Sequence, residues 1–342
     1  MHVLVLTQNN IVSPKYGGGL RVSALIEQLL GQGHHVSVIR FRLPDDQPST
    51  ATTRLPIRDI VVPRTSQMAS VAALIHLASR TAERMALAFH SESKVDLVQS
   101  DPPWAALTGQ RIAERLGVPH VLLSQNCETA LARQFADSSP AHRLPIVGPL
   151  VTNLNLGVLE WAEKRVIERA TLTLTPSAGD REEMASVGIR LDHVEVLPNG
   201  TNVRQATRAE RDAIRSRLNL APATPTVIFV GRMDYPPNAE AVKVICTHIA
   251  PRCPDLKFLL VGLNPPAITT PDNVIMVGAV DSVDGYLGAS DLSIVPILQG
   301  SGTRIKILDA WAAGLPVLST SVGASGLNYE AGRHIMIEDD LA

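Results

Sequence analysis

The regular alternation of short apolar runs with helical patterns is the feature that most constrains the fold of this chain. Near-continuous apolar runs bounded by turn residues are typical of strands that are buried on both faces of a parallel sheet. Helical segments separate these runs, and this alternation predicts parallel sheets covered by helices on both faces. In the first half, the predicted strands cover residues 2–7, 36–41, 95–99, 120–123, 172–175 and 194–197.

A second alternating series follows a change in composition. Residues 204–225 are rich in charge and then in Ala, Pro and Thr, which predicts a connecting helix and a linker. Because 342 residues exceed one ordinary core, we expect an N-terminal domain over 1–203 and a C-terminal domain over 226–342. The predicted class is α/β, with two Rossmann-like doubly wound domains that face each other across a cleft. The strands predicted in the second domain cover 227–230, 258–261, 274–277, 292–297 and 334–337.

Residues 297–323 combine a glycine turn with the start of a helix. Gly300 and Gly302 interrupt the chain just before a helical pattern that carries Arg304, Lys306 and Asp309. Free backbone N–H groups and the positive end of the helix dipole favour phosphate at such a position. The two cations add charge, and Asp309 is near enough to reach a hydroxyl group, so the segment predicts a site for a sugar linked to phosphate.

An ordinary helix start is the alternative interpretation of this segment. Ser301 or Thr303 would then be the N-cap, and Asp309 would merely complement the helix dipole.

Composition excludes several classes of protein. The net charge is −2 and aromatic residues make up only 4% of the chain, so we expect no nucleic-acid partner. The three cysteines, Cys127, Cys246 and Cys253, lack zinc or redox spacing, which favours a reducing, cytoplasmic compartment. The chain opens without a basic leader, and no stretch approaches about 20 apolar residues, so we expect neither secretion nor membrane integration.

Short motifs occur in a fixed order along essentially the whole chain. They are 17–19 (GGG), 125–128 (QNCE), 198–200 (PNG), 229–238 (FVGRMDYPPN), 260–262 (LVG), 277–280 (VGAV), 291–296 (DLSIVP) and 300–306 (GSGTRIK). Each motif is weak alone, but their order and spacing resemble the retaining glycosyltransferases of the GT-B fold, family 4 (glycosyl transferases group 1). The resemblance implies a C-terminal domain that binds a nucleotide-activated sugar and an N-terminal domain that presents the acceptor.

The resemblance also implies roles for single residues. The backbone from Gly302 to Ile305 would hold the distal phosphate, Asp309 the ribose, Arg232 the diphosphate, and the backbone near Val280 the base. The implied catalytic residues are Arg232, Glu128 and Gln125, of which the last two line the sugar and acceptor side. The implied donor-binding residues are Gly18, Gly19, Asn238, Val280, Ser301, Gly302, Thr303, Arg304, Ile305, Lys306 and Asp309.

Each of these assignments has a structural alternative. Arg232 could be a surface arginine after a strand, although its planar guanidinium suits two phosphate oxygens at once. Gly18 and Gly19 would permit close backbone approach to the donor, or they could simply form a tight entry to a helix. Glu128 could be a solvated loop charge.

Four departures from the family pattern bear on activity. Two glutamates eight positions apart correspond here to Ser301 and Asp309, and the shorter aspartate has less reach. The usual lysine six positions after Arg232 is Asn238, which leaves Arg304 or Lys306 to supply the charge. The histidine often found at the end of the acceptor strand is replaced by Gln125. Members of the family also continue through further helices, so we expect the C-terminal domain here to lack its last helices.

The predicted reaction moves a sugar from a nucleoside diphosphate donor to a hydroxyl acceptor, with retention as the resemblance implies. The acceptor could be a glycan, a lipid-linked compound or a small molecule. No Asp-x-Asp follows a strand, so we expect neither an essential metal nor a cofactor. A catalytically inactive nucleotide-sugar-binding partner subunit is the alternative.

Two further enzyme classes lack their motifs. An oxidoreductase would need G-x-G-x-x-G directly after the first strand, and a serine hydrolase would need glycine where Leu327 stands.

A basic stretch in the first half suggests one further partner. Its arginines alternate with apolar residues and could touch an anionic lipid or glycan, giving peripheral membrane contact through the N-terminal domain; the alternative is a solvated helix face. The stretch comprises Arg54, Arg58, Arg64, Val71, Leu74, Ile75, Leu77, Arg80 and Arg84.

Overall fold

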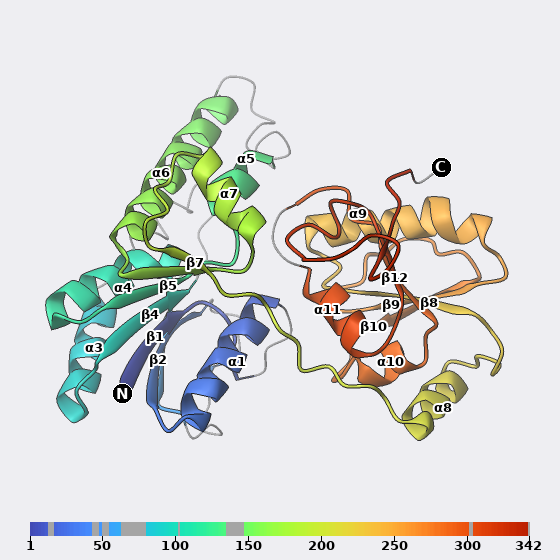
Figure 1. Cartoon of the computed structure of the whole chain (residues 1–342), viewed down its shortest axis with the longest axis horizontal. Coiled ribbons are helices and arrows are strands. Elements are labelled where there is room, and N and C mark those ends of the chain that lie inside the picture. The colour runs from blue at the N-terminus through green and yellow to red at the C-terminus, as the bar shows by residue number, and fades with distance from the viewer. Residues whose placement is uncertain are drawn as a thin grey trace. The chain divides into compact units, whose positions relative to one another are not determined.

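The computed structural model describes residues 1–12, 17–42, 48–49, 55–62, 80–101, 103–134, 147–300 and 304–340. The chain divides into two compact units, Met1–Pro198 (unit 1) and Asn199–Ala342 (unit 2). Each unit contains a parallel β-sheet with helices packed against it (Figure 1). The predicted α/β class with two Rossmann-like units is therefore confirmed. The division lies a few residues before the expected boundary at 203, and residues 204–225 belong to unit 2.

The sheet of unit 1 has the strand order β3-β2-β1-β4-β5-β6-β7 within the described residues, and every pair of neighbours is parallel. The strands are β1 His2–Thr7, β2 His35–Arg42, β3 Ile57–Val61, β4 Leu97–Asp101, β5 His120–Leu123, β6 Leu172–Thr175 and β7 Val194–Val196. The helices are α1 Gly17–Gly31, α3 Arg80–Glu92, α4 Pro103–Leu116, α5 Glu128–Gln134, α6 Val147–Arg169 and α7 Ala178–Ser186.

The central strand β1 explains why this sheet forms. All six of its residues are buried, as a near-continuous apolar run predicts for a strand covered on both faces. It pairs with β2 on one side and with β4 on the other, so that Thr7 lies opposite both Arg40 and Asp101. The chain first builds outward through β2 and β3 and then crosses back to β4. In open α/β sheets ligands bind where the strand order reverses, and in unit 1 this place is at the carboxyl ends of β1 and β4.

Unit 2 repeats this arrangement with the order β10-β9-β8-β11-β12-β13 in its described part. Its reversal lies between β8 and β11. The strands are β8 Thr226–Val230, β9 Lys257–Val261, β10 Val274–Gly278, β11 Leu292–Val295, β12 Val317–Ser319 and β13 Met336–Ile337. The helices are α8 Arg208–Arg217, α9 Pro236–Val244, α10 Asp284–Gly288 and α11 Ile305–Ala312, and α9 continues into a π-helix, Ile245–Ile249, and a 3₁₀ turn, Ala250–Arg252.

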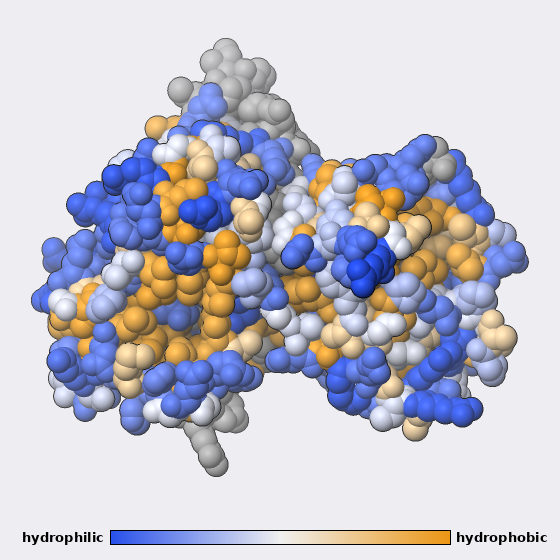
Figure 2. Space-filling model, viewed as in Figure 1, coloured by the Kyte–Doolittle hydropathy of each residue, from blue (hydrophilic) through white to orange (hydrophobic). Residues whose placement is uncertain are grey.

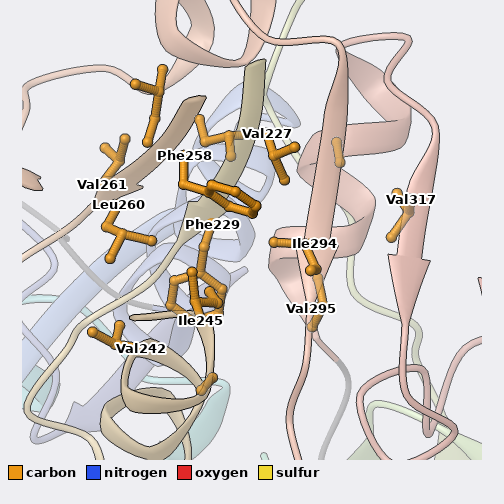
Figure 3. Packing of buried hydrophobic residues seen from close by; sticks show 14 of the residues in the cluster. Val227, Phe229, Val242, Ile245, Phe258, Leu260, Val261, Ile294, Val295 and Val317 are labelled. Carbon is orange, nitrogen blue, oxygen red and sulfur yellow. The ribbon is translucent and has the colours of Figure 1, made fainter. Parts of the chain in front are cut away.

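The core of unit 2 forms where α9 covers β8 and β9. Phe229 and Phe258 are nearly inaccessible to solvent and pack together with Ile245 and Val242 (Figure 3). Ile294 on β11 lies beside Phe229 on the other side of the cluster. This core fixes the carboxyl end of β8, from which the next residues of the chain leave the sheet.

Part of the segment that we expected to be a linker folds as a helix of unit 2. Helix α8 begins at a capping box formed by Thr207 and Glu210, and it packs against α10. Arg215 of this helix is only 4% exposed and donates hydrogen bonds to the carbonyl oxygens of Ala289 (2.7 Å), Ala221 (2.7 Å) and Thr224 (2.6 Å). A buried guanidinium with several acceptors anchors the segment, so it does not behave as a free tether.

Hydrophobic residues reach the surface in patches between hydrophilic ones on the face drawn in Figure 2. The exposed apolar side chains include Leu154 and Trp161 on α6, and single residues of this kind are normal on a protein surface. No helix in the described ranges joins the length and the apolar character that a bilayer span requires.

Gly262, directly after β9, allows the backbones of two strand ends to approach each other. Its φ is +153°, and a Cβ there would overlap the carbonyl group of Gly231. Gly262→Ala is therefore expected to destabilise unit 2 by about 3 kcal/mol or more, because strain and overpacking add. Gly278→Ala is the matched control: its φ is +80° but nothing lies within 4 Å, so only about 1–2 kcal/mol is expected. Chemical denaturation of both variants measures the difference, and equal losses would contradict the clash.

Candidate functional site

The carboxyl end of β8 carries the first candidate residue of unit 2. Gly231 and Arg232 follow the strand, at the place where the strand order reverses. The Arg232 side chain is 38% exposed, and its Nε lies 2.9 Å from Asp234 Oδ1. Its guanidinium is therefore held by a carboxylate at the strand end and is partly exposed to solvent.

Lys306 and Asn238 form a linked pair beside this strand end. Lys306 Nζ donates to Asn238 Oδ1 at 2.7 Å, and Asn238 Nδ2 donates to the Arg232 carbonyl at 2.8 Å. The ammonium also lies 4.1 Å from the centre of the Phe229 ring. A Cβ on Gly231 would lie 2.9 Å from Asn238 Nδ2 and 3.0 Å from Lys306 Nζ, so glycine makes room for both groups.

Burial lowers the pKa of Lys306 well below its ordinary value. The charge of Arg304 lowers it further, and Asp309 opposes the shift. An ammonium that is destabilised in this way gains from any anion that binds next to it. The sequence left Arg304 or Lys306 to replace the lysine expected at position 238, and the structure places Lys306 directly against Asn238.

The start of α11 holds two more predicted residues. Arg304 precedes the helix and donates from Nη2 to the Gly300 carbonyl at 2.8 Å, and Gly300 has a φ of +107°. Ile305 is the first helical residue, so its N–H is among those without an acceptor inside the helix. The predicted phosphate-binding residues Ser301, Gly302 and Thr303 lie outside the described residues.

Asp309 is placed one turn further along α11. Its Oδ1 accepts a hydrogen bond from Thr201 Oγ1 at 2.5 Å, and burial raises the pKa of its carboxyl group. Val280, predicted to meet the base, is half-buried after β10 and packs against the edge of the unit 2 core.

The reversal point of unit 1 gathers polar side chains from three strand ends. Asp101 ends β4, Asn9 follows β1 and Gln125 follows β5. The Oδ1 atom of Asp101 accepts from Asn9 Nδ2 at 2.8 Å and from Gln125 Nε2 at 2.7 Å. Helix α1 begins at the predicted glycines, and a Cβ on Gly18 would overlap Gln125 Oε1. Gly19 is buried within the same helix turn.

A second carboxyl pair lies where α5 begins. The buried Glu163 of α6 accepts from the backbone N–H groups of Glu128 (2.7 Å) and Thr129 (2.8 Å), so it caps this helix. Burial, together with the charge of the neighbouring Glu163, raises the pKa of Glu128 to about 7. Glu128 is therefore half-buried and fixed in place, in contrast to the solvated loop charge that was the alternative.

The basic stretch considered for membrane or glycan contact is only partly described. Arg58 on β3 forms an ion pair with Glu92 (2.8 Å) and lies 3.9 Å from the centre of the Phe89 ring. This arginine therefore packs against its own unit. The residues of the stretch that lie outside the described residues are Arg54, Arg64, Val71, Leu74, Ile75 and Leu77.

Within the described residues, no group of three or more His, Cys, Asp or Glu side chains could hold a metal ion.

Two family models match most of the chain. The glycosyl transferase 4-like domain matches residues 16–200, and glycosyl transferases group 1 matches residues 224–342. The two matches correspond to the two structural units and contain all of the predicted site residues.

Individual proteins agree with the family models. D-inositol 3-phosphate glycosyltransferase of Nocardia farcinica is 27% identical over 183 residues, which cover 48% of this chain and 40% of the relative. The chain thus aligns with less than half the length of this relative.

Solved structures share the fold at low identity. Sucrose-phosphate synthase from Thermosynechococcus elongatus has a TM-score of 0.70 at 18% identity, covering 94% of this chain and 82% of that one. HepE from Anabaena, in complex with UDP and glucose, has a TM-score of 0.67 at 14% identity, covering 99% and 86%. These matches establish two parallel-sheet units of the GT-B type. With more than half of its residues matched by one family model, the chain belongs to the glycosyl transferase 4-like family.

Proposed function

We propose that this protein is a retaining family 4 glycosyltransferase that moves a sugar from a nucleoside diphosphate donor to a hydroxyl acceptor, without an essential metal or cofactor. The observation that carries the proposal is the cationic cluster of Arg232, Arg304 and Lys306 at the strand-order reversal of unit 2. A diphosphate bound beside these cations would add negative charge to that of Asp234, the carboxylate that pairs with Arg232.

Each cation has a distinct role in this proposal. Arg232, held at the end of β8, pairs with diphosphate oxygens, and its planar fork suits two oxygens at once. Lys306 supplies the point charge that the family pattern places at position 238. Asp309, at the second turn of α11, accepts hydrogen bonds from the ribose hydroxyls.

These groups act on the leaving group rather than on the sugar. Breaking the anomeric C–O bond gives an oxocarbenium-like transition state and adds negative charge to the departing diphosphate. Fixed cations and N–H groups that are aimed at this charge lower the barrier without reorganising. The acceptor hydroxyl then attacks the anomeric carbon on the face from which the diphosphate leaves and gives its proton to the leaving diphosphate, which retains the anomeric configuration.

The polar residues of unit 1 serve the sugar and the acceptor in this proposal. Gln125 offers an amide and Glu128 a carboxyl group, and the absence of a side chain at Gly18 makes room for the Gln125 amide. Gly18 and Gly19 also allow the backbone to approach the donor closely in this proposal. A relative is named for D-inositol 3-phosphate, so a cyclitol phosphate is the first acceptor to test.

Thermal shift with nucleoside diphosphates tests the donor part directly. At 100 times its dissociation constant, a ligand adds about 2.7 kcal/mol of stability. UDP is the first probe, because one structural relative was solved with UDP and glucose. We expect one diphosphate to stabilise the native protein and Arg232→Ala and Arg304→Ala to lose the effect. If no diphosphate stabilises the protein, the donor assignment is wrong.

Turnover separates the enzyme from an inactive binding subunit. The assay measures release of nucleoside diphosphate from the donor sugar, with and without EDTA. Release in both conditions supports an enzyme that needs no metal. Nucleotide binding without any turnover across donors and acceptors would favour the inactive partner subunit.

A further inference from the structure

Asp101 is a buried acidic residue for which the family pattern supplied no role. It ends β4, its side chain is inaccessible to solvent, and it lies beside the ends of β1 and β5. This is the place in unit 1 where the strand order reverses and where a ligand is expected in such sheets. A charged group is expensive to bury, so its surroundings must compensate for the lost water.

The contacts of Asp101 determine how Gln125 is oriented. A carboxylate can only accept hydrogen bonds, and its Oδ1 receives one from Gln125 Nε2 at 2.7 Å and one from Asn9 Nδ2 at 2.8 Å. The NH₂ group of Gln125 must therefore face Asp101. Its carbonyl oxygen then lies on the opposite side, against Gly18, where any side chain would overlap it.

A glutamine amide has two orientations of nearly equal shape, and they present opposite hydrogen-bonding groups to a ligand. With the NH₂ group turned inward, Gln125 offers an acceptor at the Gly18 turn. With the NH₂ group turned outward, the same position would offer a donor, and a substrate hydroxyl could then only accept from it. The buried carboxylate selects the first orientation.

We propose that Asp101 is a positioning residue that holds the Gln125 carboxamide in one orientation, so that Oε1 accepts a hydrogen bond from a hydroxyl of the sugar substrate. This inference rests on the proposed function. It assigns Asp101 no contact with the substrate, because the whole effect passes through Gln125.

The charge state of Asp101 makes the orientation dependent on pH. Burial raises the pKa of Asp101 to about 7, although hydrogen bonds from Thr7, Asn9 and Gln125 and the charge of Arg21 on α1 all act to lower it. Arg21 itself donates to the carbonyl of Leu197 at 2.8 Å. Above pH 7 the ionised carboxylate requires a donor from Gln125. Below pH 7 the protonated acid can donate to an amide oxygen, so the flipped orientation becomes available.

The first experiment observes the amide without any substrate. In protein labelled with ¹⁵N-glutamine, the side-chain NH₂ signal that disappears in Gln125→Met belongs to Gln125. We expect this signal to be protected from exchange with solvent and to titrate near pH 7. In Asp101→Asn we expect the titration to be absent. A Gln125 signal that is indifferent to pH and to Asp101→Asn would overturn the positioning role.

The second experiment measures what the orientation does for the substrate. For Asp101→Asn and Gln125→Met we expect kcat/KM for the donor sugar to fall about 10-fold, equivalent to one hydrogen bond, with UDP affinity changed less than 2-fold. The double variant is expected to lose no more than either single variant, because both remove the same hydrogen bond. Native kcat/KM should fall below pH 7, and the fall should be smaller in Asp101→Asn, where the Glu128 carboxyl, whose pKa is also about 7, still titrates.

Asp96→Asn is the matched control, since this exposed aspartate lies just before β4, at the strand's other end, and accepts from the His2 N–H. We expect it to keep native kinetics. If the KM for the donor sugar changes, the hydroxyl belongs to the donor; if the KM for the acceptor changes, it belongs to the acceptor. Additive losses in the double variant, or an unchanged kcat/KM in Asp101→Asn, would overturn the inference. Absence of UDP binding by the native protein would instead overturn the proposed function, and the amide signal would still decide the orientation.

Discussion

Replacing Lys306 with methionine is expected to lower kcat/KM for the nucleotide-sugar donor by about 100- to 1,000-fold, the usual effect of removing one preorganised group from a charged transition state. Methionine keeps much of the side-chain volume next to the Phe229 ring but removes the ammonium. Lys243→Met is the control, because this lysine is exposed on α9 in the same unit. Steady-state kinetics and the melting temperature of both variants make the comparison, and native kinetics in Lys306→Met would contradict the role of the ammonium.

A reciprocal exchange tests whether the position or the charge matters. Lys306 Nζ and Asn238 Oδ1 are 2.7 Å apart, so a lysine at either position can bring its ammonium to the same place. We expect the combination of Lys306→Asn with Asn238→Lys to recover at least 10-fold of the activity that Lys306→Asn alone loses. If activity does not recover, the position of Lys306 matters in addition to its charge.

Phe229→Ala is expected to destabilise unit 2 by about 3–5 kcal/mol, the usual effect of deleting a large side chain from a closed core. Phe229 is nearly inaccessible and packs with Phe258 and Ile245 (Figure 3). Because its ring also lies under Lys306, activity should fall together with stability.

The measurement must isolate unit 2, since two units need not unfold as one. Trp311 lies in α11 of unit 2, so its fluorescence reports on this unit once Trp104 and Trp161 are replaced by phenylalanine. Denaturant titration in that background gives the free energy of unfolding. Ile268→Ala, at a position 39% exposed, is the control and should cost less than about 0.5 kcal/mol. Similar losses in the two variants would contradict the core assignment.

The strands could be predicted where both faces of a strand are buried, because the sequence of such a strand is a continuous run of apolar residues. Strands β1, β5 and β6 have the bounds that the sequence predicts, because polar or turn residues limit each run at both ends. Strand β4 was predicted to end at residue 99 but continues to Asp101. Its last residues, Gln99, Ser100 and Asp101, are polar and buried together. A buried polar strand end has the composition of a loop, so periodicity misses it.

Element ends also differ from the prediction at the C-terminal strand. The strand predicted over 334–337 is limited to Met336–Ile337.

The candidate site was predictable in kind but not in detail. The glycine turns and cations were visible in the sequence, because their residue types already indicate an anion. The pairing of Lys306 with Asn238 was not, since it joins positions on two different helices. The same holds for Glu163, which caps α5 from α6, and for Asn9, which shares Asp101 with Gln125. None of these partners has a local signal, because each is defined by which strand ends and helices become neighbours in the sheet.

The hydrogen bond between Thr201 and Asp309 connects the candidate ribose site to the segment where the chain passes from one unit to the other. Thr201 follows the division at Pro198 by a few residues, and its hydroxyl donates to the carboxylate proposed to receive the ribose. A ligand hydroxyl that competes for this carboxylate changes the free energy of the Thr201 contact. Thermodynamic linkage makes the effect reciprocal, so any rearrangement of the connecting segment that breaks the contact changes nucleotide affinity by the same factor.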